Sequence, residues 1–441
     1  MPLTHSDRQL RDFIMSNATL GSERGFDDQG RPVLPVNELL DSAIIAVTGF
    51  ILFAVMFLNQ THIETNDKVK LLGGLELILR LAATGAAGVL GLYGFAFVPK
   101  IRLAFFSFPG FWVLGILAFC LLGTICSPEL KTSLPYLATL ISVVLFAPFA
   151  FYVVGTKQFV NIVLASMALS LLGSWFLYLF MPNYGVMLEH ISNTETVARM
   201  GGTSHPNTLS GIVVLMIVIL AYLYFEGKRS LSFCLPLFAL GIATLIFTGT
   251  RVAAVAAIAS TFIVYRKFWL RVDILPITAG LIVTLLLAAL VLFSSEGANP
   301  ISSALGSATR SGDVDEITSV TGRSQIWTYV IEMIVERPLV GYGPGLSKYF
   351  LDSKEMLLHP HNVVLNVTFA GGIFAGAFAV MMFVHQLLIS IGGKYRLAAL
   401  ISFIIILNSL TEVPIFDYIP GTPTVLWLAA IFWPVLDDGS L

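Results

Sequence analysis

The chain has 441 residues, a length that would ordinarily correspond to two or three soluble domains. Its composition excludes that architecture, because 56% of the residues are hydrophobic, only 12% are charged and the mean hydropathy is +0.85. The balance of 25 Lys and Arg against 27 Asp and Glu excludes a general basic surface for nucleic acid. The composition therefore predicts an all-α polytopic membrane protein whose main solvent is lipid.

Hydropathy predicts where the chain crosses the bilayer, since a spanning helix needs about 20 mainly apolar residues. This criterion predicts twelve spans, near residues 39–58, 77–98, 104–126, 134–154, 160–181, 208–225, 231–250, 252–265, 274–294, 363–391, 397–411 and 422–436. The first 38 residues are polar and contain no apolar core, so we expect no cleavable signal peptide.

The distribution of basic residues predicts the orientation of the bundle. If the amino terminus is cytoplasmic, the short inner connections are consistently basic, as the positive-inside rule expects. These connections carry Lys100, Arg102, Lys157, Lys228, Arg229, Arg266, Lys267, Arg271, Lys394 and Arg396. The chain then divides into a cytoplasmic tail (1–38), nine spans (39–294), a large external loop (295–362) and a part with three spans and the C-terminal tail (363–441).

The external loop contains a predicted amphipathic helix. Apolar residues recur near a helical period in Ser324–Arg337, and Pro338 ends the pattern. The apolar stripe comprises Ile326, Trp327, Val330, Ile331, Ile334 and Val335. The stripe fits a helix that lies on the membrane surface or caps the bundle, and it fits an ordinary half-buried loop helix equally well.

Three ionisable residues next to spans indicate a polar site. Arg199 precedes the sixth span, Arg251 lies in the outer turn between the seventh and eighth, and His361 precedes the tenth. The predicted topology puts all three on the outer side. Guanidinium groups bind phosphate oxygens in a bidentate fork, and an imidazole accepts or donates a proton near neutral pH. Together they suit an anionic ligand, whereas arginines that anchor to lipid headgroups and a structural histidine are the alternatives.

Other polar residues have simpler interpretations. Glu76 and Arg80, four residues apart, predict an ion pair within one helix. Glu412 and Asp417 could orient a histidine or an acceptor sugar, but we favour solvated loop residues. His359 and His361 have no nearby cluster of further metal ligands, so we expect no metal site.

Several short motifs, in their order along residues 195–376, resemble those of the O-antigen ligase and polymerase family. RMGG at 199–202 with Pro206 and Asn207, and TGTR at 248–251, resemble its two arginine motifs. GRSQIW at 322–327 and ERPLVGYGPG at 336–345 resemble its long external loop. His361 and Asn362, followed by Gly371 and Gly372, resemble its histidine motif.

The resemblance implies a GT-C-like fold and an inverting, metal-independent glycosyltransferase without a cofactor, in a bacterial inner membrane with its active site facing the periplasm. The donor would be a glycan on undecaprenyl diphosphate, with Arg199 and Arg251 holding the diphosphate. His361 would be the general base for the acceptor hydroxyl. Supporting roles fall to His205, Asn207, Arg323, Arg337, Tyr342 and Asn362.

The identity of the acceptor is open between two alternatives within this family, a polymerase and a ligase. A polymerase adds the glycan to a second lipid-linked repeat, which we favour, whereas a ligase transfers it to lipid A core or to a protein. A secondary transporter or lipid flippase is the alternative of another class, because twelve spans are common there as well. Transporters typically have repeated halves and ionisable sites near the bilayer midplane, which this sequence does not show.

Overall fold

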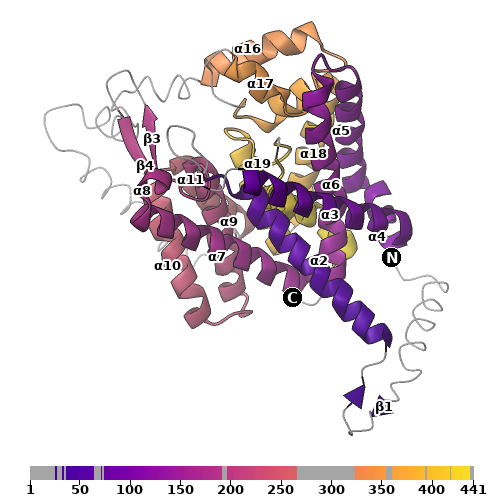
Figure 1. The fold of residues 1–441 in the computed structure, drawn as a ribbon, viewed down its shortest axis with the longest axis vertical. Helices are drawn as coiled ribbons and strands as arrows, with labels where there is room; N and C mark the ends of the chain where they lie inside the picture. The colour runs from indigo at the N-terminus through magenta and orange to yellow at the C-terminus, as the bar shows by residue number, and fades with distance from the viewer. Residues whose placement is uncertain are drawn as a thin grey trace, which may run out of the picture.

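The computed structural model describes residues 25–26, 32–33, 36–63, 71, 74–190, 196–265, 323–353, 360–392, 395–417 and 419–437. Over these ranges the chain forms a bundle of helices (Figure 1). The helices are α2 (Val36–Gln60), α3 (Gly74–Phe97), α4 (Pro99–Phe106), α5 (Phe108–Ile125), α6 (Leu130–Val154), α7 (Thr156–Phe180), α8 (Pro182–Gly185), α9 (Pro206–Phe225), α10 (Leu231–Thr248), α11 (Arg251–Val264), α16 (Arg323–Glu336), α17 (Leu346–Asp352), α18 (Val363–Gly392), α19 (Arg396–Ser409) and α20 (Thr422–Leu436). Two short antiparallel strand pairs accompany them, β1 (Gly25–Phe26) with β2 (Pro32–Val33) and β3 (Val186–His190) with β4 (Thr196–Met200).

The described helices confirm an all-α polytopic membrane protein. Eight of them are long and apolar enough to cross a bilayer, and α19 and α20 are shorter apolar helices. The predicted span at 104–126 is wrong at its start, because Ser107 separates the short helix α4 from α5, whose first turn contains Pro109. The predicted span at 274–294 lies outside the described residues.

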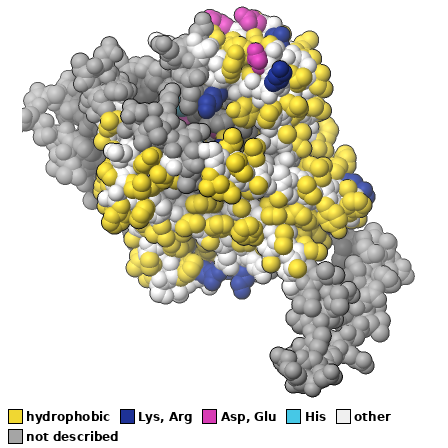
Figure 2. Space-filling view, viewed as in Figure 1, with side chains coloured by type: hydrophobic (Ala, Val, Ile, Leu, Met, Phe, Trp, Pro, Cys, Tyr) yellow, Lys and Arg dark blue, Asp and Glu magenta, His cyan; other side chains and the backbone are white. Residues whose placement is uncertain are grey.

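The outer surface of the bundle is apolar, as contact with lipid requires. Large side chains on the spans are strongly exposed, including Phe97 at 72%, Phe180 at 71% and Ile246 at 71%. Figure 2 shows hydrophobic side chains covering the middle of the visible face, with small groups of Lys and Arg near its upper, lower and right-hand margins. An exposed apolar surface of this extent matches contact with the hydrocarbon of a bilayer.

Contacts between distant parts of the chain sort the helix ends into two groups. The Arg396 guanidinium donates to Glu226 at 2.7 Å, which joins two ends that were predicted to be cytoplasmic. The Asn59 amide donates to the Pro420 carbonyl at 3.0 Å, which joins two ends that were predicted to lie outside. Both contacts agree with the predicted alternation of the connections, while the side that faces the periplasm stays a prediction.

Helix α16 caps the end of the bundle that was predicted to face outward. It ends at Glu336, just before Pro338, as the sequence pattern predicts. Ile326 and Val330 are buried on its inner face, whereas Ile331 and Val335, which belong to the same predicted stripe, are exposed. Figure 1 shows α16 and α17 at the top of the molecule, above α5 and α18.

Helix α18 is interrupted in its middle at Gly372, whose φ of 77° and ψ of −177° are not helical. The external loop supplies the backbone hydrogen bonds that the interruption releases. Tyr342 N–H donates to the Phe369 carbonyl at 2.8 Å and Gly343 N–H to that of Ala370 at 2.8 Å. The motif GYGPG is thereby joined through the backbone to the two residues just before the paired glycines at 371–372.

We predict that Gly372→Ala destabilises the protein. A Cβ at this position would lie 2.5 Å from the Leu339 carbonyl oxygen, and the positive φ strains any residue with a Cβ by about 1–3 kcal/mol. Thermal unfolding of the detergent-solubilised variant should show a clear fall in Tm. Gly211→Ala is the matched control, because an added Cβ meets nothing within 4 Å there. Equal Tm values for the two variants would contradict this account of the interruption.

Candidate active site

The hairpin of β3 and β4 places Arg199 beside the start of α9 and the end of α10. Its guanidinium is buried, with 4% of the residue exposed, and its described contacts come from several segments. Nε donates to the Thr248 carbonyl at 2.7 Å, and Nη2 donates to Asn207 Oδ1 at 2.9 Å and to Thr250 Oγ1 at 2.7 Å. Nη1 pairs with the Glu189 carboxylate. A buried arginine needs such partners, because an uncompensated charge in the interior is strongly unfavourable.

These contacts hold the turn that carries Arg251. Helix α10 ends at Thr248, Gly249 adopts a left-handed φ of 62°, and α11 begins at Arg251. Arg199 binds this turn on both sides of Gly249, through Thr248 and Thr250. The structure thus brings the backbone of the second arginine motif to the side chain of the first. The side chain of Arg251 lies outside the described part of the chain.

Asn207 links the Arg199 cluster to a second polar cluster. Its amide oxygen accepts from Arg199, and its amide nitrogen donates to Glu412 Oε1 at 3.0 Å. The backbone N–H of Asn207 donates to Nδ1 of His205, the N-cap of α9, at 3.2 Å. Desolvation by the surrounding protein lowers the pKa of His205; Glu412 raises it and Arg199 lowers it further. The lowered pKa favours the neutral imidazole that Nδ1 needs to accept this hydrogen bond.

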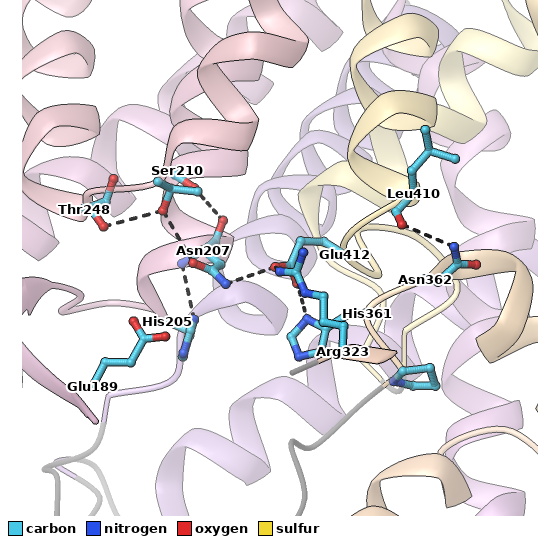
Figure 3. A network of polar contacts seen from close by, with 12 residues as sticks. Glu189, His205, Asn207, Ser210, Thr248, Arg323, His361, Asn362, Leu410 and Glu412 are labelled. Atoms are coloured by element: carbon cyan, nitrogen blue, oxygen red, sulfur yellow. Dashed lines mark hydrogen bonds and ion pairs between the residues drawn. The ribbon is translucent and has the colours of Figure 1, made fainter. Parts of the chain in front are cut away.

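Glu412 lies at the centre of the site, in the connection between α19 and α20. Its Oε1 accepts from Asn207 and from Arg323 Nη2 at 2.8 Å, and its Oε2 is 2.9 Å from His361 Nδ1. Figure 3 shows Glu412 between Asn207 and His361. The prediction that Glu412 is a solvated loop residue is therefore wrong. Its side chain is only 24% exposed and binds three partners from three other segments.

The backbone around His361 is held in an unusual conformation. His361 has a φ of +51°, which is uncommon for a residue other than glycine and often marks a functional site. The preceding carbonyl, that of Pro360, accepts a 2.8 Å hydrogen bond from the indole of Trp327 on α16. His361 itself is 7% exposed. The cap helix and the carboxylate of Glu412 thus hold the histidine from two directions.

Asn362 fixes the start of α18. Its side-chain oxygen accepts from the Leu365 N–H at 3.0 Å, as an N-cap does. Its amide nitrogen donates to the Leu410 carbonyl at 3.3 Å, two residues before Glu412. Asn362 therefore ties the segment that carries His361 to the segment that carries Glu412.

Two of the predicted supporting residues have their described contacts elsewhere. Arg337 Nη1 donates to the carbonyl of Cys126 beyond the end of α5 at 2.9 Å. The Tyr342 hydroxyl donates to Glu336 at 2.8 Å, and its ring stacks on Phe369 with centroids 4.9 Å apart. Both residues hold the external loop against the bundle, so their contribution to the site is indirect.

The remaining polar predictions have mixed outcomes. The predicted ion pair of Glu76 and Arg80 is confirmed, and Arg80 also donates to the Thr61 carbonyl at 2.7 Å beyond the end of α2. His359 lies outside the described residues. The metal interpretation that involved it stays untested.

The arrangement combines compensated charges with the imidazole of His361, which Glu412 orients. Arg199 and Arg323 supply positive charge, and Glu189 and Glu412 balance it. A neutral imidazole that donates its Nδ1 hydrogen to a carboxylate carries its lone pair on Nε2. Such a ring can accept a proton from a hydroxyl group, which is the geometry of a general base.

Comparison with known proteins agrees with the predicted resemblance. Residues 236–380 match the family model described as O-antigen ligase. No curated protein matches the chain. The matched range contains Arg251, Arg323 and His361, whereas Arg199 and Glu412 lie outside it. Residues 236–380 are therefore similar to the O-antigen ligase family, in agreement with the resemblance of the motifs, and this similarity supports a multi-pass membrane enzyme of the O-antigen ligase or polymerase type.

Proposed function

We propose that the protein transfers a glycan from undecaprenyl diphosphate to an acceptor hydroxyl at the periplasmic face of a bacterial inner membrane. One observation carries the proposal: the imidazole of His361 is 2.9 Å from a carboxylate and is linked through Glu412 and Asn207 to the arginine cluster. A proton acceptor and cationic groups thus belong to one site, as transfer from a diphosphate requires.

His361 is the proposed general base. Its Nε2 takes the proton of the acceptor hydroxyl as that oxygen forms a bond to the anomeric carbon of the donor. The bond from the anomeric carbon to the diphosphate oxygen breaks, its electron pair stays on that oxygen, and the anomeric configuration is inverted. The imidazolium then gives its proton to the released diphosphate or to water. This step needs no metal ion and no cofactor.

Arg251 is the proposed ligand of the diphosphate. It begins α11 beside the turn that Arg199 holds, and a helix N-terminus also favours negative charge. The expectation that Arg199 itself binds the diphosphate stays a prediction. Its burial and its contacts with Thr248 and Thr250 favour a role in which it holds the turn of Arg251 and adds positive charge to the site.

The position of the site favours a transferase over a transporter. The described network involves residues at the start of α9 and just outside the ends of α18 and α19, rather than residues at the middle of these spans. Transporters typically bind their substrate near the bilayer midplane. We further propose that the acceptor is a second lipid-linked repeat, as in a polymerase, with ligation to lipid A core or to a protein as the alternative.

We predict that His361→Ala and His361→Asn both abolish transfer by the purified protein from a defined polyprenyl-diphosphate-linked donor. Asparagine tolerates a positive φ and keeps a hydrogen-bonding side chain, so it separates loss of the base from backbone strain. Loss of a general base typically reduces the rate by about a hundredfold to ten-thousandfold. The unsubstituted enzyme should remain active with a chelator present. Full activity in both variants, at normal thermal stability, would refute the role of His361.

We predict that replacing either arginine by lysine rescues activity only in part. A lysine at 199 keeps the charge but cannot bind Thr248, Asn207 and Thr250 together, so misplacement of the turn should reduce kcat by about a hundredfold and lower Tm. Arg251→Ala should instead raise KM for the donor and lower kcat, with little change in Tm.

Arg396→Lys, at the opposite group of helix ends, is the matched control for these substitutions. It should leave kcat and KM unchanged. Unchanged donor KM and kcat in Arg251→Ala would contradict the proposed diphosphate site.

Lipid extracts of a deletion strain should distinguish the two acceptors. If the protein is a polymerase, as we propose, its loss leaves single repeat units on undecaprenyl diphosphate. Mass spectrometry of the extracted lipids measures the length of the stranded glycan. Accumulation of long glycans on the carrier would instead identify a ligase.

A further inference from the structure

We propose that Glu412 is a positioning residue that sets the tautomer of His361 and couples this histidine to the arginine cluster. The inference rests on the proposed function and names a residue outside the range matched by the family model. Glu412 does not touch the substrate in this account. It acts through His361 on one side and through Asn207 on the other.

The first argument comes from the number and origin of its partners. Asn207 at the start of α9, Arg323 at the start of α16 and His361 before α18 all converge on the one carboxylate. A loop carboxylate with a purely solubilising role has no need of such partners. Bringing four segments of the chain to one side chain fixes their relative positions at the outer end of the bundle.

The second argument comes from the chemistry of the imidazole. A carboxylate only accepts hydrogen bonds, so the contact of Oε2 with Nδ1 requires the hydrogen of a neutral His361 to be on Nδ1. Nε2 is then the basic nitrogen. When Nε2 takes a proton, the negative charge of Glu412 stabilises the resulting imidazolium, as an acidic partner does in hydrolase triads.

The third argument comes from the direction of the hydrogen bonds between the two clusters. The amide oxygen of Asn207 accepts from Arg199 and its amide nitrogen donates to Glu412. Arg199 can only donate and an ionised Glu412 can only accept, so one orientation of the amide satisfies both. The series of hydrogen bonds from Arg199 through Asn207 and Glu412 to His361 therefore has a fixed donor and acceptor at the Asn207 amide. It connects the turn of Arg251 with the proposed base.

These contacts make Glu412→Gln a sharp test. Two donors, from Asn207 and Arg323, meet at Oε1, so the amide oxygen of a glutamine should take that position. The amide nitrogen would then face Nδ1 of His361 and donate to it. This arrangement moves the imidazole hydrogen to Nε2 and removes the proposed base without removing the histidine.

We expect Glu412→Gln to reduce kcat by about a hundredfold or more, with little change in KM for the lipid-linked donor. Nitrogen-15 NMR of the protein labelled at histidine should show the Nδ1–H tautomer of His361 in the unsubstituted protein and the Nε2–H tautomer in the variant. Glu412→Asp keeps the charge and should restore part of the lost kcat. Glu332→Gln, an exposed carboxylate on α16, is the matched control and should change neither measurement.

Several outcomes would overturn the inference. One is a kcat in Glu412→Gln within about twofold of the unsubstituted enzyme. Another is an Nε2–H tautomer in the unsubstituted protein, which can be measured even if the glutamine variant does not fold. If His361→Asn also keeps full activity, the proposed function fails with it. If only Glu412→Gln keeps activity while His361→Asn loses it, the base stands and the positioning role alone is wrong.

Discussion

The carboxylate of Glu412 is the contact on which the arrangement of the site depends. It accepts from Arg323 and Asn207 and contacts His361, so it neutralises positive charge that would otherwise be poorly compensated in a mostly buried region. Arg199 and Glu189 form a second compensated pair, and Asn207 bridges the two. Segments more than 200 residues apart in the chain are thereby held at one polar centre on top of an apolar bundle.

The interruption of α18 explains how the loop that carries α16 can be positioned precisely. Gly372 breaks the helix, and the carbonyls of Phe369 and Ala370 accept from the external loop instead of from the next helical turn. The same region carries α16, whose Trp327 binds the carbonyl before His361. The external loop, the broken span and the histidine therefore behave as one structural unit.

The sequence predicted the parts of the fold that follow from hydropathy and period. The described apolar helices lie where the spans were expected, and α16 ends before Pro338 because proline cannot continue a helix there. Hydropathy missed the break at Ser107, since the residues on both sides of it are equally apolar.

The site was predicted less completely than the fold. Arg199, Asn207, Arg323 and His361 were expected to be functional, and the structure brings them together. Glu412 was misjudged because its partners come from three distant segments, so no spacing in the sequence marks it. The sequence also could not predict the hydrogen bonds from Arg199 to Thr248 and Thr250, because they depend on how the hairpin of β3 and β4 packs against the turn.

An experimental map of the protein in a lipid bilayer, with a polyprenyl diphosphate bound, tests the central claim most directly. The account predicts Glu412 within hydrogen-bonding distance of both His361 and Asn207, with diphosphate density at the start of α11. A map in which Glu412 points into solvent, or in which the diphosphate lies at the opposite end of the bundle, would contradict it.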